Sequence, residues 1–301
     1  MPDRSDPASE TDKDTAPGWV KPVMRLGYAT RGITYVLVGG LVILAAWTGG
    51  EAEGTKGALA ELRDTPWGRP ALVAIAFGFW AYALWRLIDA WKDLEDYGHG
   101  AKGVVARGGQ LVTGAIHATL GVSTLRMAFG GDEGGNGAES LTSKALQMPN
   151  GALIVMAVGA VTVCAGLYYG WKGIAEKYKD HIHGTWLTER LDPAIKAGLV
   201  AHGLVIVLVG LFLWFAGQTT DPDQAGGVSK AFATVRAQPF GRILLGMLGF
   251  GMLGFAIYCW VEACYRVIPR LAGDDVTTMA ARAKAKAKAT ARSGLRQAGA
   301  G

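Results

Sequence analysis

The chain of 301 residues is half apolar, contains 44 glycines and carries a formal net charge of +5. Its apolar residues gather in six blocks of about 17–25 residues, which is the length a helix needs to cross the hydrocarbon core of a bilayer. This grouping sets the chain apart from soluble globular domains. The glycines have no three-residue period, which excludes collagen-like and low-complexity chains.

In chain order, a segment rich in Asp, Thr, Ser and Pro comes first and is predicted to be disordered over residues 1–18. Because the first apolar block follows acidic residues and carries Arg31 inside it, we expect a retained membrane helix rather than a cleaved signal peptide. The six predicted membrane spans are Tyr28–Thr48, Pro70–Ala90, Val104–Phe129, Gly151–Gly170, Ala194–Ala216 and Phe240–Ala263.

An internal repeat divides these spans into three units. Each unit begins with a basic residue that is followed by glycines two, seven and fourteen positions later. A short apolar-periodic stretch, predicted to be an interfacial helix, and then a Pro-x-Gly lead into the second span of each unit. The basic residues are Arg25, Arg107 and Lys196, and the prolines are Pro66, Pro149 and Pro239.

The predicted fold is therefore an all-α membrane protein, with six transmembrane helices arranged as three pseudo-repeated helical hairpins, each with a short interfacial helix. The repeats are assigned to residues 19–98, 99–188 and 189–270, followed by a basic Ala/Lys tail, 271–301, that is predicted to be disordered. Of the 30 Lys and Arg residues, 21 fall on the side of the termini and 8 on the other side, with Arg31 inside a span. By the positive-inside rule, both termini are predicted to be cytoplasmic.

Several sequence pieces of the first repeat carry a family resemblance. They are Arg25-Leu-Gly-Tyr-Ala-Thr-Arg-Gly32, Gly57-Ala-Leu, and Pro66-Trp-Gly-Arg69 running to Gly78-x-x-x-Tyr82-x-x-Trp85-Arg86. In these pieces the chain resembles the bacterial membrane family known as domain of unknown function 1206, over roughly residues 20–270. The second repeat departs most, since Gln110 and Thr113 stand where the first has Tyr28 and Arg31. The resemblance implies three tandem two-helix units in a bacterial inner membrane, and no activity.

Ionisable residues inside a membrane are costly, so they mark candidate functional sites. Arg31 lies inside the first span, and Thr113 and His202 occupy the equivalent positions of the other repeats. Around a pseudo-threefold axis, these residues would form a polar ring suited to an anion. The alternative interpretation is that Arg31 extends to the headgroups and that His202 is a buried hydrogen-bonding residue.

A second set of candidate residues marks the inner ends of the spans. Within a hairpin we expect the ion pairs Arg25–Asp89 and Lys196–Glu262, while Arg107 and Lys172 would need partners from neighbouring repeats. Such a network would close the cytoplasmic side, either as a fixed structure or as a gate.

The remaining residues give no prediction of a cofactor or a metal site. His117 is a second intramembrane histidine, but it lies about 6 Å from His202 along the helix axis, an offset that disfavours a shared haem. His181 and His183 are interpreted as part of a solvated loop, and the three cysteines as packing residues. Since no nucleophile–base, phosphate-binding or dinucleotide motif is present, we do not expect an enzyme.

Two functions stay open, and the first is preferred by a small margin. The first is a small-solute carrier or channel that favours anions, with a site near the pseudo-threefold axis. The alternative is a non-transporting scaffold or accessory subunit with a lipid-binding basic tail. Membrane lipids are the expected partners, and anionic headgroups are favoured over nucleic acid for the tail because the last span places it at the membrane.

Overall fold

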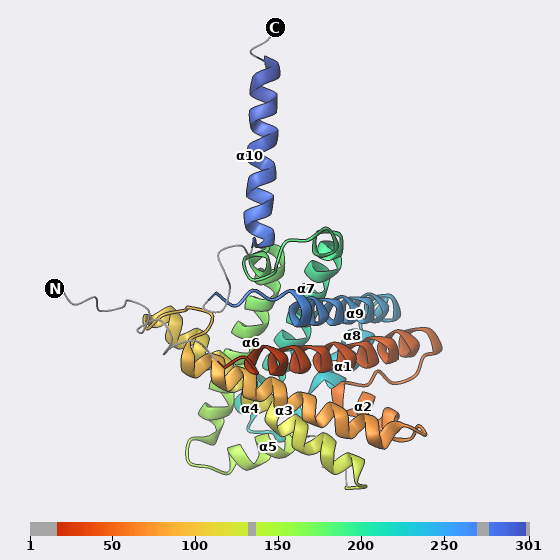
Figure 1. Ribbon diagram of the computed structural model, residues 1–301. Helices are drawn as coiled ribbons and strands as arrows, with labels where there is room; N and C mark the ends of the chain where they lie inside the picture. The colour runs from red at the N-terminus through yellow and green to blue at the C-terminus, as the bar shows by residue number, and fades with distance from the viewer. Residues whose placement is uncertain (1–16, 132–136, 270–276, 299–301) are drawn as a thin grey trace, which may run out of the picture.

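The computed structural model describes residues 17–131, 137–269 and 277–298, without the side chains of residues 137, 138 and 289–298. In this part the chain is helical and has no strand beyond two isolated bridges. Figure 1 shows six long helices: α1 (Val20–Thr48), α3 (Gly68–Lys92), α4 (Ala101–Ala128), α6 (Gly151–Ile174), α7 (Trp186–Thr219) and α9 (Gly241–Tyr265). Each repeat is a long helix, a short helix and a long helix. The short helices are α2 (Thr55–Arg63), α5 (Gly137–Leu146) and α8 (Val228–Arg236), and α10 (Met279–Ala298) follows the third repeat.

The second long helix of each repeat begins at the glycine of the Pro-x-Gly, at Gly68, Gly151 and Gly241. A Cβ atom at these positions would lie 2.1, 2.1 and 1.8 Å from a backbone carbonyl oxygen of the preceding short helix. Only glycine allows so close an approach. The proline of each Pro-x-Gly therefore lies in the turn before the helix.

Five of the long helices are long and apolar enough to cross a membrane, namely α1, α3, α6, α7 and α9. α4 has 28 residues but is not among them. Polar side chains, among them Gln110, Thr113 and His117, lower the hydropathy of α4. Length and composition thus indicate a multi-pass membrane protein and support five of the six predicted spans.

The long helices pair mainly between repeats. α3 packs along α4, α6 along α7, and α1 along α9, while smaller interfaces join α1 to α3 and α7 to α9. The helices therefore form an open series in the order α4, α3, α1, α9, α7 and α6. In Figure 1 the α6–α7 pair runs across the direction of α1 and α9. The packed hairpin predicted for the second repeat is wrong, because α4 and α6 lie at opposite ends of the series and do not pack together.

Glycines of the repeated pattern bring the paired helices close together. A Cβ atom on Gly32 of α1 would lie 2.2 Å from Nε1 of Trp260 on α9, and one on Gly121 of α4 would lie 2.4 Å from Nε1 of Trp80 on α3. Such close fits hold helices together in a membrane, where apolar side chains gain nothing by leaving lipid for protein. The pairing of helices is therefore specified by small residues.

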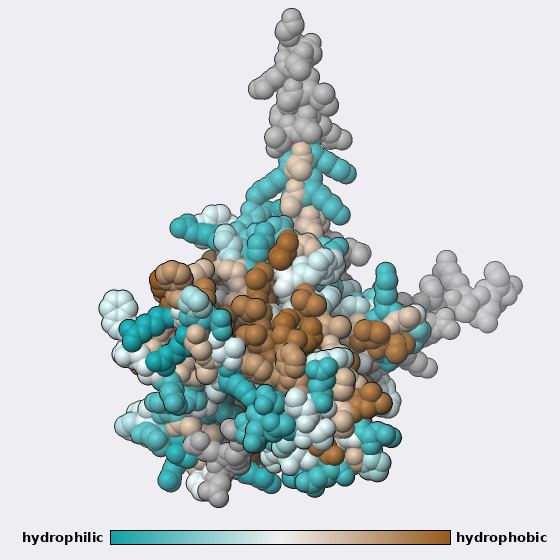
Figure 2. Space-filling model, turned by 180° about the vertical axis from the view of Figure 1, so that it is seen from behind, coloured by the Kyte–Doolittle hydropathy of each residue, from teal (hydrophilic) through white to brown (hydrophobic). Residues whose placement is uncertain are grey.

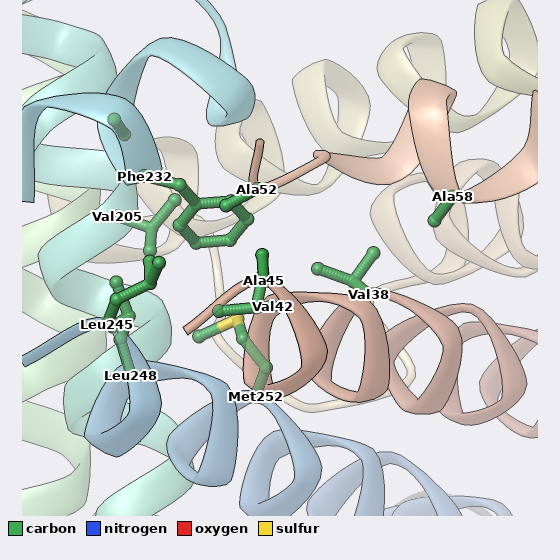
Figure 3. Packing of buried hydrophobic residues seen from close by; sticks show 11 residues of the cluster. Val38, Val42, Ala45, Ala52, Ala58, Val205, Phe232, Leu245, Leu248 and Met252 are labelled. Atoms are coloured by element: carbon green, nitrogen blue, oxygen red, sulfur yellow. The ribbon is translucent and has the colours of Figure 1, made fainter. Parts of the chain in front are cut away.

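We call the end of the bundle at which α1 begins the proximal end, and the end that carries the three short helices the distal end. Near the distal end, α1, α7, α8 and α9 share a buried apolar cluster (Figure 3). The fully buried Phe232 ring of α8 lies beside Val205 of α7 and next to Val42 and Ala45 of α1. This burial docks the third short helix on the bundle.

Large apolar side chains cover the outside of the long helices. On α6 and α7 the exposed ones include Leu153, Val158, Val161, Leu204 and Phe215. In Figure 2 hydrophobic residues gather in the middle of the face, with hydrophilic residues toward α10 and at the opposite end. An extended exposed apolar surface of this kind is typical of contact with lipid or another protein.

The tail was expected to be disordered, but α10 occupies residues 279–298. Alanine has the highest helix propensity and Lys and Arg rank close behind it, so the alternation of Ala with Lys favours a helix. α10 projects away from the bundle (Figure 1), and the Lys286 ammonium lies 2.6 Å from the Glu189 carboxylate of α7. The disorder expected for residues 1–16, 271–276 and 299–301 concerns residues outside the described part of the chain.

Candidate functional site

A cleft opens between α4 and α6, because these two helices do not pack together. Its volume is about 3020 Å³. α4 and α6 form its walls, and residues of α1 and α7 form its floor. It extends from Glu95 and Lys177 at the proximal end to Glu53 and Ser229 at the distal end, so it follows the length of the bundle.

The first glycine of the repeated pattern is packed against the second long helix in the first and third repeats, but not in the second. In the first repeat the backbone of Tyr82 covers Gly27, where an added Cβ would lie 2.5 Å from the Tyr82 Cα. In the third repeat the backbone of Phe255 covers Gly198, where an added Cβ would lie 2.2 Å from the Phe255 nitrogen. The equivalent pair in the second repeat is Gly109 and Ala165. A Cβ on Gly109 would meet nothing within 4 Å, and Ala165 presents only a methyl group to the cleft.

Arg31 lies on the floor of the cleft and is 3% exposed. Its Nη1 donates a hydrogen bond to the Tyr82 hydroxyl at 2.8 Å. Its guanidinium carbon lies 4.6 Å from the centre of the Tyr82 ring and 5.4 Å from that of Phe255, a cation–π arrangement. Nε has no hydrogen-bond partner, and no carboxylate of the described residues pairs with this side chain. A buried cation without a counter-charge favours the binding of an anion.

Two histidines flank Arg31. The His202 ring stacks on Phe255 with centroids 3.8 Å apart, and the rings of Tyr35 and Tyr169 meet it edge-on at 5.2 and 5.1 Å. The His117 ring lies 4.5 Å from the Tyr82 ring. Arg31 and His202 therefore contact one aromatic cluster, with His117 at its α4 side.

The third residue of the expected polar ring, Thr113, lines the same cleft. Its hydroxyl donates to the Gly109 carbonyl at 2.7 Å, and its own carbonyl oxygen lies 2.8 Å from Nδ1 of His117. The second repeat thus reaches Arg31 through His117, a residue that the sequence placed at a different depth. The Tyr82 ring contacts both residues, with its centre 4.5 Å from that of the His117 ring and 4.6 Å from the Arg31 guanidinium carbon. In the described part of the chain, no three His, Cys, Asp or Glu residues gather as a metal site.

A buried polar network crosses the proximal end. Gln110 donates from Nε2 to the Asp89 carboxylate at 2.7 Å, and Arg86 lies 3.5 Å from Asp89 and 3.8 Å from Glu95. Arg266 then pairs with both Glu95 and Glu262. Elements from all three repeats, α3, α4 and the end of α9, are joined in this way.

Glu95, in the loop between α3 and α4, lies at the centre of this network. Burial alone would raise the pKa of its carboxyl, but the guanidinium groups of Arg266 and Arg86 hold that pKa well below its usual range. Burial likewise opposes the charge on Arg266, yet Glu262 and Glu95 keep its pKa well above the ordinary value. The charged forms of Glu95 and Arg266 therefore support each other.

The two ion pairs expected within hairpins do not form among the described residues. Arg25 is exposed, and Lys196 lies 2.5 Å from Glu176 instead of near Glu262. Arg107 donates to the carbonyl of Ala90 at the end of α3. The reason is that α4 and α7 begin beside helices of the preceding repeat, so their basic residues meet α3 and α6.

Of the six residues expected in the network, Asp89 and Glu262 belong to it. Lys172 donates to the Tyr258 hydroxyl at 2.9 Å and lines the cleft nearby. Sequence reasoning missed Arg86, Glu95 and Arg266. The sequence could have predicted Arg86 as a partner of Asp89. Arg86 lies inside a predicted span three residues before Asp89, a spacing that brings side chains together on a helix.

Three comparisons with known proteins bear on this architecture. The family model described as Domain of Unknown Function (DUF1206) matches the chain three times, at residues 26–93, 108–176 and 197–266. These matches confirm the predicted family and the three repeats. The chain is also 27% identical over 262 residues to Uncharacterized protein YxxB of Bacillus subtilis strain 168, which covers 86% of this chain and 95% of that relative. No solved structure matches the chain.

Proposed function

The chain belongs to the family described as Domain of Unknown Function (DUF1206), whose name assigns no activity, and we propose that it is a carrier or channel for small anions with its binding site at Arg31. The observation that supports this most directly is a buried guanidinium, unpaired with any described carboxylate, on the floor of an open cleft. An arginine stays protonated at all working pH values, so an anion is the group that compensates it.

The charges around the cleft support the same proposal. The proximal network holds the carboxylates of Asp89, Glu95 and Glu262. Their formal charges are matched by Arg86 and Arg266 within the network and by Lys172 beside it. This leaves Arg31 as a surplus positive charge deeper in the bundle.

The proposal includes a topology. α4 is taken as the sixth membrane span, with its polar residues facing the cleft rather than lipid, and both termini are cytoplasmic in a bacterial inner membrane. Gln110, Thr113 and His117 of α4 all line the cleft, which supports this assignment. The distribution of Lys and Arg, 21 against 8, supports the orientation.

The test combines binding with flux. The purified protein in detergent is screened for a rise in unfolding temperature with small inorganic and organic anions, because a ligand that binds only the folded state stabilises it. Arg31→Gln with His202→Ala should abolish the rise and the uptake of the same anion into vesicles. Arg25→Gln, an exposed arginine on the same helix, is the control. An unchanged response in the double variant would contradict the assigned site.

A second candidate, a scaffold without transport, is favoured by one observation. α10 projects from the bundle and carries Arg282, Lys284, Lys286 and Lys288 at the side of the proposed cytoplasmic surface. Basic residues at a membrane surface attract anionic headgroups by up to about 1 kcal/mol each. If removal of the chain beyond residue 278 abolishes stabilisation by anionic lipid, and no soluble anion stabilises the parent protein, the scaffold is the better assignment.

A further inference from the structure

The cleft opens laterally, between the long helices α4 and α6. The direction of this opening determines which ligands can enter the cleft. α6 is apolar enough to cross a membrane, and α4 lies across from it. An opening between two membrane-crossing walls meets the hydrocarbon core of the bilayer over most of its length. A ligand can therefore enter from the lipid.

The walls of the cleft are largely hydrocarbon. Val105, Val112 and Ile116 of α4 line it on one side and Val161 of α6 on the other. These four side chains are between 52 and 76% exposed, so no other part of the described chain covers them. Val205 and Val209 of α7 extend the apolar lining along the floor. A hydrophilic solute would lose water against these walls without recovering hydrogen bonds.

Arg31 is a charged side chain on the floor of the cleft, between the charged residues that line its two ends. It lies eleven residues after the start of α1 and seventeen before its end, which is about 16 Å and about 25 Å along the helix at 1.5 Å per residue. One leaflet of a bilayer has a hydrocarbon depth of about 15 Å. The cleft on the distal side of Arg31 is therefore long enough for one extended hydrocarbon chain.

We propose that the cleft binds a single-chain amphipathic anion, whose headgroup pairs with Arg31 and whose hydrocarbon chain lies along α4, α6 and α7. This rests on the anion site proposed above and narrows its ligand class from small soluble anions to lipid-like ones. The headgroup accepts hydrogen bonds from the guanidinium, whose Nε has no partner within the protein. The tail lies beside Ile116 of α4, Val161 of α6 and Val205 of α7.

The test uses the full-length protein in nanodiscs of zwitterionic lipid and a long-chain carboxylate that carries a photoreactive diazirine in its tail. Labelled peptides are identified by mass spectrometry, and labelling is competed with palmitate, palmitate methyl ester or acetate. We expect labels on residues 112–123 of α4 and 158–165 of α6, which line the cleft on the distal side of Arg31, and we expect palmitate alone to displace them. Arg31→Gln should reduce labelling by about 10–100-fold, the effect of losing charge-assisted hydrogen bonds, and Arg25→Gln should leave it unchanged.

A second variant tests the lateral opening. Ala165→Phe places an aromatic side chain in the cleft, at the position equivalent to Phe255, and should reduce labelling without loss of Arg31. Ala165→Leu serves the same purpose if the larger side chain prevents folding, which size-exclusion chromatography and the unfolding temperature check.

The outcomes separate the two proposals. Equal competition by the methyl ester, or unchanged labelling in Arg31→Gln, overturns the amphipathic-anion site. Competition by acetate as strong as by palmitate also overturns it, but leaves the small-anion site standing. If, in addition, no soluble anion stabilises the parent protein through Arg31, both proposals fail.

Discussion

The Arg31 guanidinium donates to the Tyr82 hydroxyl at 2.8 Å, and this bond joins α1 to α3 at the floor of the cleft. The same hydroxyl accepts a hydrogen bond from Nε of Arg86 at 2.9 Å, so it links the proposed anion site to the proximal network. One phenol thus holds two cationic side chains in place, since a hydroxyl oxygen has two acceptor positions.

Removing this hydroxyl should destabilise the protein while leaving the ring in place. In Tyr82→Phe two charged donors lose their acceptor, at a cost of about 1.5–3 kcal/mol for each hydrogen bond to a charged group. We expect a lower unfolding temperature, measured in detergent. Tyr168→Phe is the matched control, because Tyr168 is 54% exposed. Equal effects of the two changes would show that the Tyr82 bonds contribute nothing specific.

Substitution of the first glycine of each repeat tests whether α4 and α6 lie apart in the second repeat. Gly27→Ala and Gly198→Ala place a methyl group within 2.5 and 2.2 Å of backbone atoms, so each should destabilise by about 1–3 kcal/mol. Gly109→Ala meets no neighbour and should be neutral or stabilising by up to about 1 kcal/mol, from helix propensity. The measurement is the unfolding temperature of the three variants in one detergent. A loss for Gly109→Ala as large as for the others would mean that α4 and α6 pack together in solution.

The carrier function proposed above requires that the site can be covered, and the second repeat contains candidate residues for doing so. Gly109 and Ala165 match the packed pairs of the other repeats. Cysteines at both positions, in a chain whose Cys164, Cys259 and Cys264 are replaced, should cross-link under oxidation in vesicles and stop anion flux. Leu111→Cys with Ala165→Cys is the control, since Leu111 is not among the residues that line the cleft. Continued flux without any cross-link would argue against closure by this pair.

Glu95 should make stability depend on pH in the acid range. Its folded pKa lies below the ordinary value because Arg266 and Arg86 outweigh the effect of burial. The carboxylate therefore stabilises the fold fully above its unfolded pKa of about 4.3, and this stabilisation is lost as the pH falls below that value. Glu95→Gln should lower the free energy of unfolding by about 3–5 kcal/mol at pH 7, as expected when a buried pair loses one partner.

The measurement is the unfolding temperature of the parent and of Glu95→Gln between pH 3 and pH 8. The difference should be largest at neutral pH and shrink in the most acidic samples. Glu61→Gln is the control, because Glu61 is exposed on α2. A difference that stays constant across the range would mean that the Glu95 charge does not account for the stabilisation.

The sequence by itself determined the helices, the three repeats and the family, because apolar blocks and the spacing of glycines are local patterns. It also identified Arg31 and His202 as polar residues within apolar blocks, but left open whether Arg31 is buried or extends to the headgroups. It did not determine which helices pair. The expected ion pairs assumed packing within repeats, whereas Lys196 meets Glu176 and Arg107 meets the end of α3, across repeat boundaries.

Only the tertiary structure decided that the second repeat is open and that a cleft leads to Arg31. The pattern glycine Gly109 matches Gly27 and Gly198, so the sequence alone predicts the same packing for all three. What differs is the partner, Ala165 in place of Tyr82 or Phe255, together with the course of α6 along α7 and across α1. Packing between distant segments depends on the sum of such contacts. Equivalent glycines can therefore lie at a helix interface in two repeats and beside an open cleft in the third.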